Sequence, residues 1–306
     1  MGYEELKDSL RGVAFTNPTP FSEDREDVLH DELARNVEWM VDRGAGVVIP
    51  CGNTGEYYSL SMDERAEVVA TTVEAAGDAT VVGGLGGSTK SVLHLLSRYE
   101  AAGVDAVMVM HPVHTYVHHE GIRRYYERIL EATDLGVVLY KRGPELTADH
   151  LAALAEYDNV VAVKYADNDV KAFSQAVSDV EGDVVWSNGI AERFAPSFAI
   201  EGAEAFTTGI GNFVPEQVLA LQDALRDEDW EEARRVRDLL RPYEDLREET
   251  GRGDSDVAAA NNVPAVKYGQ ELAGLYGGPV REPLVDLSEA DRERAEAYYD
   301  RIVSEV

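Results

Sequence analysis

The sequence predicts an α/β fold, a (β/α)8 TIM barrel with a C-terminal helical extension, from three observations. Eight short apolar runs recur along residues 12–208, and amphipathic stretches separate them. These runs are apolar throughout, as expected of parallel strands that helices cover on both faces. After the eighth run the pattern becomes purely helical. Eight alternating units fit a closed barrel better than an open doubly wound sheet.

The expected elements alternate strictly as far as residue 208. Strands are expected at residues 12–16, 46–51, 80–84, 105–110, 136–140, 160–164, 183–187 and 203–208. Helices are expected between them at residues 28–43, 62–76, 88–102, 121–132, 148–157, 170–180 and 192–201. The tail is expected to form a helix from residue 215 and further helices at 230–249, 263–276 and 288–306, with a polar loop at 250–256. We therefore expect a catalytic barrel over residues 1–225 and a helical extension over 226–306.

Composition narrows the partners and the compartment. The 306 residues include 28 Lys and Arg against 58 Asp and Glu, which gives a net charge of −30. No basic patch stands out, so we expect neither nucleic acid nor a membrane as a partner. Such an acidic, lysine-poor surface is typical of halophilic proteins, because high ionic strength screens the repulsion. A single cysteine, Cys51, excludes an internal disulfide, and no stretch approaches the roughly 20 apolar residues of a membrane span. We expect a cytoplasmic protein.

Lys164 is the most informative residue. It is one of six lysines and ends the apolar run 160–164. A lysine at the mouth of an apolar barrel is poorly solvated, which favours the neutral amine that can attack a ketone. The alternative is a lysine whose stem lies on apolar surface while its ammonium group reaches water.

Other polar residues follow the expected strands, where a barrel of this kind carries its reactive groups. After the second strand, Gly52, Asn53 and Thr54 open a glycine-rich turn that either cradles a carboxylate or is an ordinary tight turn. Tyr140 ends the fifth strand and is suited to proton transfer, and Arg142 two residues later is suited to binding a carboxylate. Both could equally be solvated residues at a strand end. Thr207 and Thr208 form a small polar cap on the eighth strand.

Taken together, these motifs resemble the class I aldolase superfamily of dihydrodipicolinate synthase and N-acetylneuraminate lyase. The resemblance rests on residues 16–21 (TNPTPF), residues 52–56 (GNTGE), Tyr140 and Lys164, in the right order and spacing. It implies a Schiff base on Lys164, proton relay by Tyr140 with Thr54, and 2-keto acid carboxylate binding at Asn53 and Gly52. Gly189, Thr207, Thr208 and His114 are assigned to substrate binding with them. No cofactor is implied, and a homotetramer or homodimer is implied by analogy only.

The branch of that superfamily is indicated by departures and matches. Dihydrodipicolinate synthases usually carry a threonine where this chain has Asn53, a tyrosine where it has His114 and a substrate-binding arginine where it has Glu145. Tyr140-Lys141-Arg142 instead resembles the Tyr-Asn-Arg pattern of 5-dehydro-4-deoxyglucarate dehydratases, with Lys141 in place of the usual asparagine. Residues 55–60, 132–137, 212–215 and 278–284 also resemble that branch. The function expected is dehydration of a 2-keto-3-deoxy sugar acid, with a 2-keto-3-deoxygluconate-type aldolase or dihydrodipicolinate synthase (4-hydroxy-tetrahydrodipicolinate synthase) as the alternative.

Two features favour other kinds of protein. Four of the seven histidines lie at residues 111–119, and a histidine-dense loop suits either a metal-dependent aldolase, the substrate mouth or a subunit contact. Residues 83–90 (GGLGGSTK) resemble a phosphate loop but lack the glycine before the lysine, which weakens the reading as a nucleotide-binding barrel. Lys267 also has apolar neighbours, and in a helical segment we expect it to reach solvent or a second subunit.

Overall fold

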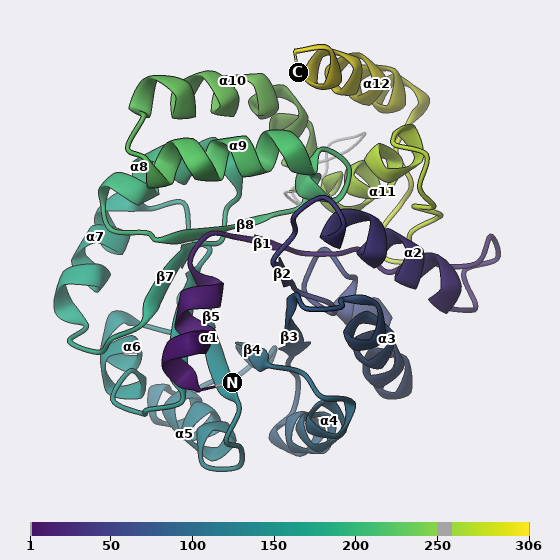
Figure 1. Ribbon diagram of the computed structural model, residues 1–306. Helices are drawn as coiled ribbons and strands as arrows, with labels where there is room; N and C mark the ends of the chain where they lie inside the picture. The colour runs from purple at the N-terminus through teal and green to yellow at the C-terminus, as the bar shows by residue number, and fades with distance from the viewer. Residues whose placement is uncertain (1, 250–258, 306) are drawn as a thin grey trace.

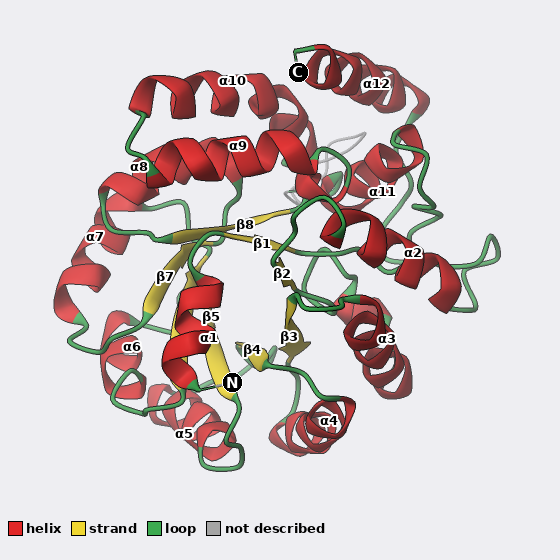
Figure 2. Ribbon diagram, in the orientation of Figure 1, coloured by secondary structure: helices red, strands yellow, loops and turns green. Residues whose placement is uncertain are grey.

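The barrel closes as predicted. The computed structural model describes residues 2–249 and 259–305. Eight strands pair in parallel and in chain order, and β8 pairs back with β1 (Figures 1 and 2). The strands are β1 (Val13–Phe15), β2 (Val47–Val48), β3 (Thr80–Leu85), β4 (Ala106–Met110), β5 (Gly136–Lys141), β6 (Val160–Tyr165), β7 (Val185–Asn188) and β8 (Ala205–Thr208). Each lies within two residues of its predicted bounds, except β2, which is shorter.

Helices surround the barrel in the predicted order (Figure 2). The ring comprises α2 (His30–Val41), α3 (Met62–Ala75), α4 (Thr89–Ala102), α5 (His119–Leu130), α6 (Ala148–Leu154), α7 (Val170–Asp179) and α8 (Ala195–Ile200). Beyond β8 come α9 (Pro215–Arg226), α10 (Trp230–Arg247), α11 (Asn262–Leu272) and α12 (Glu289–Ser304). The stretch 192–201, predicted as one helix, begins as the 3-10 turn η2 (Glu192–Phe194). The predicted loop 250–256 lies outside the described residues, and the division of the chain at residue 226 stays a prediction.

A short helix that the sequence analysis did not predict, α1 (Tyr3–Leu10), covers one end of the barrel. Its contacts all reach residues at or just before the start of a strand. The Tyr3 hydroxyl donates to the carbonyl of Asp134, Lys7 pairs with Asp183 at 2.9 Å, and Leu6 packs over the first residue of β5. The helix therefore plugs the amino-terminal end, which leaves the carboxyl-terminal ends of the strands for chemistry.

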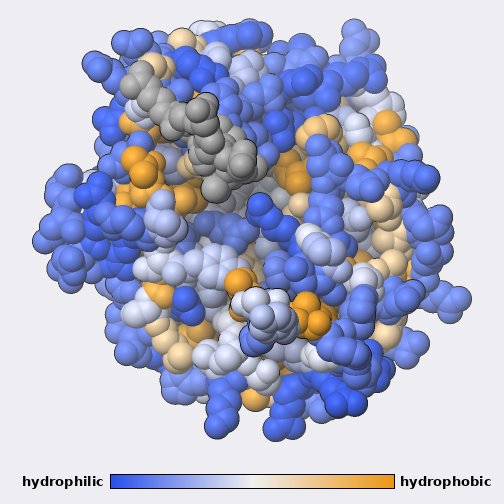
Figure 3. Space-filling view, turned by 180° about the vertical axis from the view of Figure 1, so that it is seen from behind, coloured by the Kyte–Doolittle hydropathy of each residue, from blue (hydrophilic) through white to orange (hydrophobic). Residues whose placement is uncertain are grey.

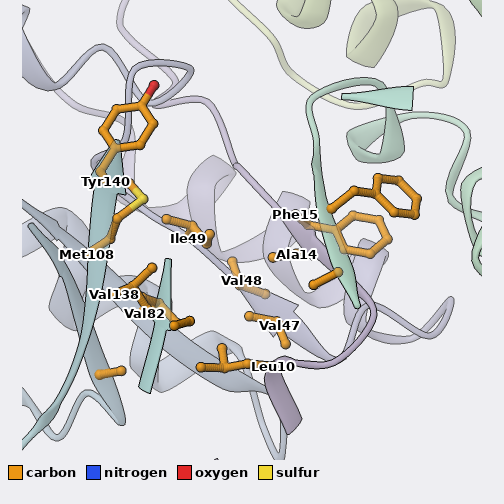
Figure 4. Packing of buried hydrophobic residues seen from close by; sticks show 14 of the residues in the cluster. Leu10, Ala14, Phe15, Val47, Val48, Ile49, Val82, Met108, Val138 and Tyr140 are labelled. Carbon is orange, nitrogen blue, oxygen red and sulfur yellow. The ribbon is translucent and has the colours of Figure 1, made fainter. Parts of the chain in front are cut away.

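Alternation along the strands fills the interior with apolar side chains. Figure 4 shows Val138 and Tyr140 of β5 on the same side as Val82 of β3 and Met108 of β4, with Leu10 at the far end. Outward-facing residues instead pack on the helices, as Tyr165 does on Phe173 and Phe198. The site at the strand ends thus lies above a packed core rather than a pore.

The outer surface is acidic and hydrophilic. Hydrophilic side chains cover most of the face shown in Figure 3, as the net charge of −30 requires. Among the described residues, no helix is both long enough and apolar enough to cross a membrane.

Close packing between β2 and β3 gives a test of the barrel. A Cβ at Gly84 would lie 2.1 Å from the carbonyl oxygen of Cys51, which is backbone and cannot move aside cheaply. We expect Gly84→Ala to lower the free energy of unfolding by about 1–3 kcal/mol, measured by denaturant titration. The matched control is Gly46→Ala, because nothing lies within 4 Å of a Cβ there. Equal unfolding midpoints for the two variants would contradict this packing.

Candidate active site

Lys164 lies inside the mouth of the barrel. It occupies β6 in register with Tyr140 of β5 and Ser187 of β7, and its Nζ is 4.8 Å from the centre of the Tyr140 ring. Its neighbour Tyr165 faces the helices, so strand alternation turns Lys164 toward the barrel axis. Gly189 follows β7 on the other side, where a Cβ would lie 3.0 Å from Cγ of Lys164. The structure thus brings Lys164, Tyr140 and Gly189 together.

Lys164 differs from the other buried lysines in having no carboxylate partner. Lys7, Lys141 and Lys267 are equally buried, and each forms an ion pair, with Asp183 and Glu4, with Asp167 and with Glu56 respectively. Within residues 2–249 and 259–305, no Asp or Glu pairs with Lys164. A buried ammonium without such a partner is strongly disfavoured.

The environment therefore favours the neutral amine. Burial, together with the smaller effect of the positive charges of Arg142 and Arg247, lowers the pKa of Lys164 to about 7. A pKa near neutrality leaves roughly half of the amine deprotonated at pH 7, which a nucleophilic lysine requires. The alternative in which the Lys164 ammonium reaches water is wrong, because the side chain is buried.

Tyr140 is held by two donors. Nδ2 of Asn53 donates to its hydroxyl oxygen at 3.1 Å, and Nη1 of Arg142 donates to the same oxygen at 3.4 Å. Both contacts use the oxygen as an acceptor, so the phenolic hydrogen is left for a group in the mouth. Asn53, Tyr140 and Arg142, predicted at the ends of the second and fifth strands, therefore form one cluster beside Lys164.

Thr54 belongs to a second group of polar contacts, on the β1 side. Its hydroxyl is buried 3.1 Å from that of Thr16, which donates to the carbonyl of Thr208 at 2.7 Å. The Thr208 hydroxyl accepts from the amide of Gly211 at 2.8 Å, so it serves the local turn. Gly52 and Thr207 are buried here as well, and their roles stay predictions.

The histidine-rich loop follows Met110, which is in register with Tyr140, but within the described residues no hydrogen bond joins its histidines to this cluster. His114 is exposed, and its Nδ1 accepts a hydrogen bond from the amide of Tyr116. His119 stacks on His150. In the described part of the chain, no three His, Cys, Asp or Glu side chains converge to hold a metal ion. The role of His114 in substrate binding stays a prediction that no contact with Lys164 or Tyr140 supports.

Two sequence features have structural explanations. Lys141 faces away from the barrel axis, where it pairs with Asp167 and donates to the carbonyl of Gly143 at 2.5 Å. Lys141, which stands in place of the asparagine of the resembled branch, therefore stabilises the loop after Arg142. Its side chain does not enter the barrel mouth. Gly83 and Gly84 lie within β3 and pack against Tyr99 and Cys51, so they do not form a phosphate-binding loop.

The prediction that Lys267 reaches solvent or a second subunit is wrong. Its side chain is buried, with 1% of the residue exposed, and its Nζ lies 2.6 Å from Oε1 of Glu56 in the same chain. Helical position alone suggested an outward lysine, but α11 packs this face against the loops after β1 and β2.

Arg247, the last residue of α10, lies at the site although its sequence context does not predict it. Its guanidinium lies against Gly209, where a Cβ would be 2.4 Å from Nη2. It pairs with Glu244 at 2.5 Å and donates to Oδ1 of Asn262 at 3.0 Å. No motif marks this arginine, because nothing in its helix indicates that it faces the barrel mouth.

The pKa of Lys164 can be measured on the resting protein. We expect pulse labelling with cyanate, which reacts with neutral amines, to carbamylate Lys164 with a midpoint near pH 7. Exposed Lys90 and Lys171 serve as internal controls for the labelling reaction. Peptide mapping of each time point gives the rates. A labelling midpoint for Lys164 well above neutral pH would contradict the account of its environment.

Comparison with known proteins agrees with this geometry. The model of the dihydrodipicolinate synthetase family matches residues 9–301. A 5-dehydro-4-deoxyglucarate dehydratase from Pseudomonas putida is 27% identical over 308 residues, covering 99% of both chains, and a probable enzyme of that name from Acinetobacter baumannii is 27% identical over 94% of this chain and 95% of its own.

Solved structures are similar throughout. The crystal structure of dihydrodipicolinate synthase from Oceanobacillus iheyensis superposes with a TM-score of 0.93 at 33% identity, covering 99% of both chains. That of Bacillus clausii gives a TM-score of 0.91 at 34% identity, over 96% of this chain and 98% of its own. The chain thus belongs to the dihydrodipicolinate synthetase family and is a lyase with a (β/α)8 barrel.

Proposed function

We propose that this lyase forms a Schiff base between Lys164 and a 2-keto acid, and that it dehydrates a 2-keto-3-deoxy sugar acid in the manner of 5-dehydro-4-deoxyglucarate dehydratase. The observation that carries the proposal is that Lys164 is buried beside the Tyr140 ring and pairs with no carboxylate among the described residues. Every other buried lysine in the described residues is neutralised by a carboxylate, so this one is arranged for chemistry rather than for charge pairing.

Imine formation uses the groups already in place. The neutral amine of Lys164 adds to the C2 ketone, and the resulting carbinolamine loses water to give a protonated imine. Tyr140 donates a proton to the departing oxygen, because its own oxygen already accepts from Asn53 and Arg142. The substrate carboxylate binds at the Asn53–Thr54 turn.

The imine then acts as an electron sink. Loss of a C3 proton gives an enamine, and departure of the γ-hydroxyl with a proton gives water and a conjugated imine. A water molecule then hydrolyses this imine, which releases the dehydrated keto acid and regenerates the Lys164 amine. Retro-aldol cleavage of the imine would instead give pyruvate as its enamine and an aldehyde. Arg142 lies at the mouth with an exposed side chain, where we assign it to the distal carboxylate of a diacid.

Dihydrodipicolinate synthase is the second candidate, because the structures at 33% and 34% identity carry that name. Three positions argue against it. Asn53, which contacts Tyr140, stands where the usual pattern of dihydrodipicolinate synthases has a threonine. The exposed His114 stands where that pattern has a tyrosine. Glu145 replaces a substrate-binding arginine with a negative charge. Mass spectrometry of the product separates loss of water from one sugar acid from the joining of pyruvate to an aldehyde.

Lys164→Ala should abolish turnover of any 2-keto-3-deoxy sugar acid, by on the order of 10⁴-fold or more, because each of the other buried lysines in the described residues is paired with a carboxylate. The measurement is product formation by chromatography in high salt. Exposed Lys171→Ala is the control and should keep full activity. Turnover retained by Lys164→Ala would refute the Schiff-base mechanism.

Arg142→Ala should raise KM for diacid substrates about 10- to 100-fold, the value of a hydrogen bond to a charged group, and leave KM for mono-acids within about threefold. Steady-state kinetics with matched six-carbon acids that differ only in the distal carboxylate give the comparison. An equal rise for both classes would remove Arg142 from distal carboxylate binding.

A further inference from the structure

Glu56 lies two residues beyond Thr54 and is tied to the C-terminal helices. Its backbone adopts a left-handed conformation (φ 55°), and its side chain is buried. Oε1 lies 2.6 Å from Nζ of Lys267 in α11, and Oε2 accepts from the amide of Arg281 at 2.9 Å. Both carboxylate oxygens are therefore held by residues far away in the sequence.

The cation is held as firmly as the anion. Nζ of Lys267 also donates to the carbonyl of Pro279 at 2.7 Å and lies 4.3 Å from the centre of the Phe21 ring. The guanidinium of Arg281 lies 4.1 Å from the centre of the same ring and pairs with Glu64 at 2.7 Å. The Phe21 ring, from the loop after β1, thus contacts the cationic side chains of both residues that hold Glu56, Lys267 through its ammonium and Arg281 through its backbone amide.

The turn between these anchors has no room to shift. A Cβ at Gly55 would lie 2.9 Å from the amide nitrogen of Cys51 and 3.1 Å from the carbonyl oxygen of Asn17. Thr19 donates to the carbonyl of Gly55 at 2.8 Å. The amide of Glu56 also donates to the carbonyl of Asn53 at 3.1 Å, so a displacement of Glu56 acts directly on the Asn53–Thr54 turn.

Stability alone is a poor explanation for this pair. Burial raises the pKa of Glu56 and lowers that of Lys267, so each charge is disfavoured and is retained because of its partner. Replacing a buried ion pair by neutral side chains of similar volume is often neutral or stabilising. The pair does, however, impose a direction and a separation that apolar side chains do not impose.

We propose that the Lys267–Glu56 ion pair positions the Asn53–Thr54 turn for the carboxylate that every 2-keto acid substrate shares. Lys267, Glu56 and Arg281 are positioning residues, since none of them has a place in the chemistry assigned above. The inference rests on the proposed function. It differs from the role given to Arg142 in its expected specificity: the pair affects mono-acids and diacids alike.

The test is borohydride trapping of the full-length protein with pyruvate and with a 2-keto diacid, followed over a range of acid concentrations by intact mass. In the double variant Glu56→Gln/Lys267→Met we expect the half-saturating concentration to rise about 10- to 100-fold for both acids. The rate at saturation should stay within about threefold of the unmodified protein, because Lys164 is untouched and Arg142 still donates to the Tyr140 hydroxyl. Lys7→Met, which removes a buried paired lysine at the other end of the barrel, is the control and should leave half-saturation unchanged.

A milder variant keeps the proposal falsifiable if the double variant does not fold. Thr19→Val removes only the hydrogen bond to Gly55 and keeps the buried volume. It should raise half-saturation for both acids by the same severalfold factor. Unchanged half-saturation in a folded variant that still forms the adduct would overturn this inference alone. Failure of the unmodified protein to form an adduct with any 2-keto acid would overturn the proposed function and this inference with it.

Discussion

This site depends most on one constraint: Lys164 is held inside a closed barrel with no carboxylate of the described residues beside it. Lys164 is buried, no carboxylate of the described residues pairs with it, and two arginines add positive charge around it. The protonated form is costly in such a place, so the fold holds an amine that is readily neutral. Strand register and side-chain alternation direct Lys164 toward the barrel axis. α1 covers the amino-terminal end of the barrel, so the amine lies at the opposite end, where the strands finish.

The C-terminal helices complete this environment rather than merely following the barrel. α10 brings Arg247 against Gly209, and α11 brings Lys267 to Glu56. Arg247 helps to lower the pKa of the Lys164 amine. Lys267 holds Glu56, beside the turn proposed to bind the substrate carboxylate. Both sides of the mouth are therefore built by helices that lie beyond β8 in the sequence.

Local pattern was enough to predict the barrel and the positions of Lys164 and Tyr140 at the ends of neighbouring strands. Uninterrupted apolar runs gave the strands, and a polar residue ending such a run gave Lys164 and Tyr140, because burial and register follow directly from strand geometry. The positions of Arg247 and of the Lys267–Glu56 pair could not be predicted from the sequence. Helical periodicity indicates which face of a helix is apolar, but not which charged residue from elsewhere in the chain contacts that helix. α1 escaped for a related reason: a helix of eight residues with no side-chain N-cap hydrogen bond gives little signal, and its packing against the strand starts defines it.

The most direct test of the central claim is to identify the residue that carries the substrate. The protein is treated with borohydride and a panel of 2-keto acids in high salt, digested, and mapped by mass spectrometry. The account predicts one stable secondary amine, on the peptide that contains Lys164, with Lys267 and Lys141 unmodified because carboxylates hold them. An adduct on another lysine, or no adduct with any acid, would contradict it.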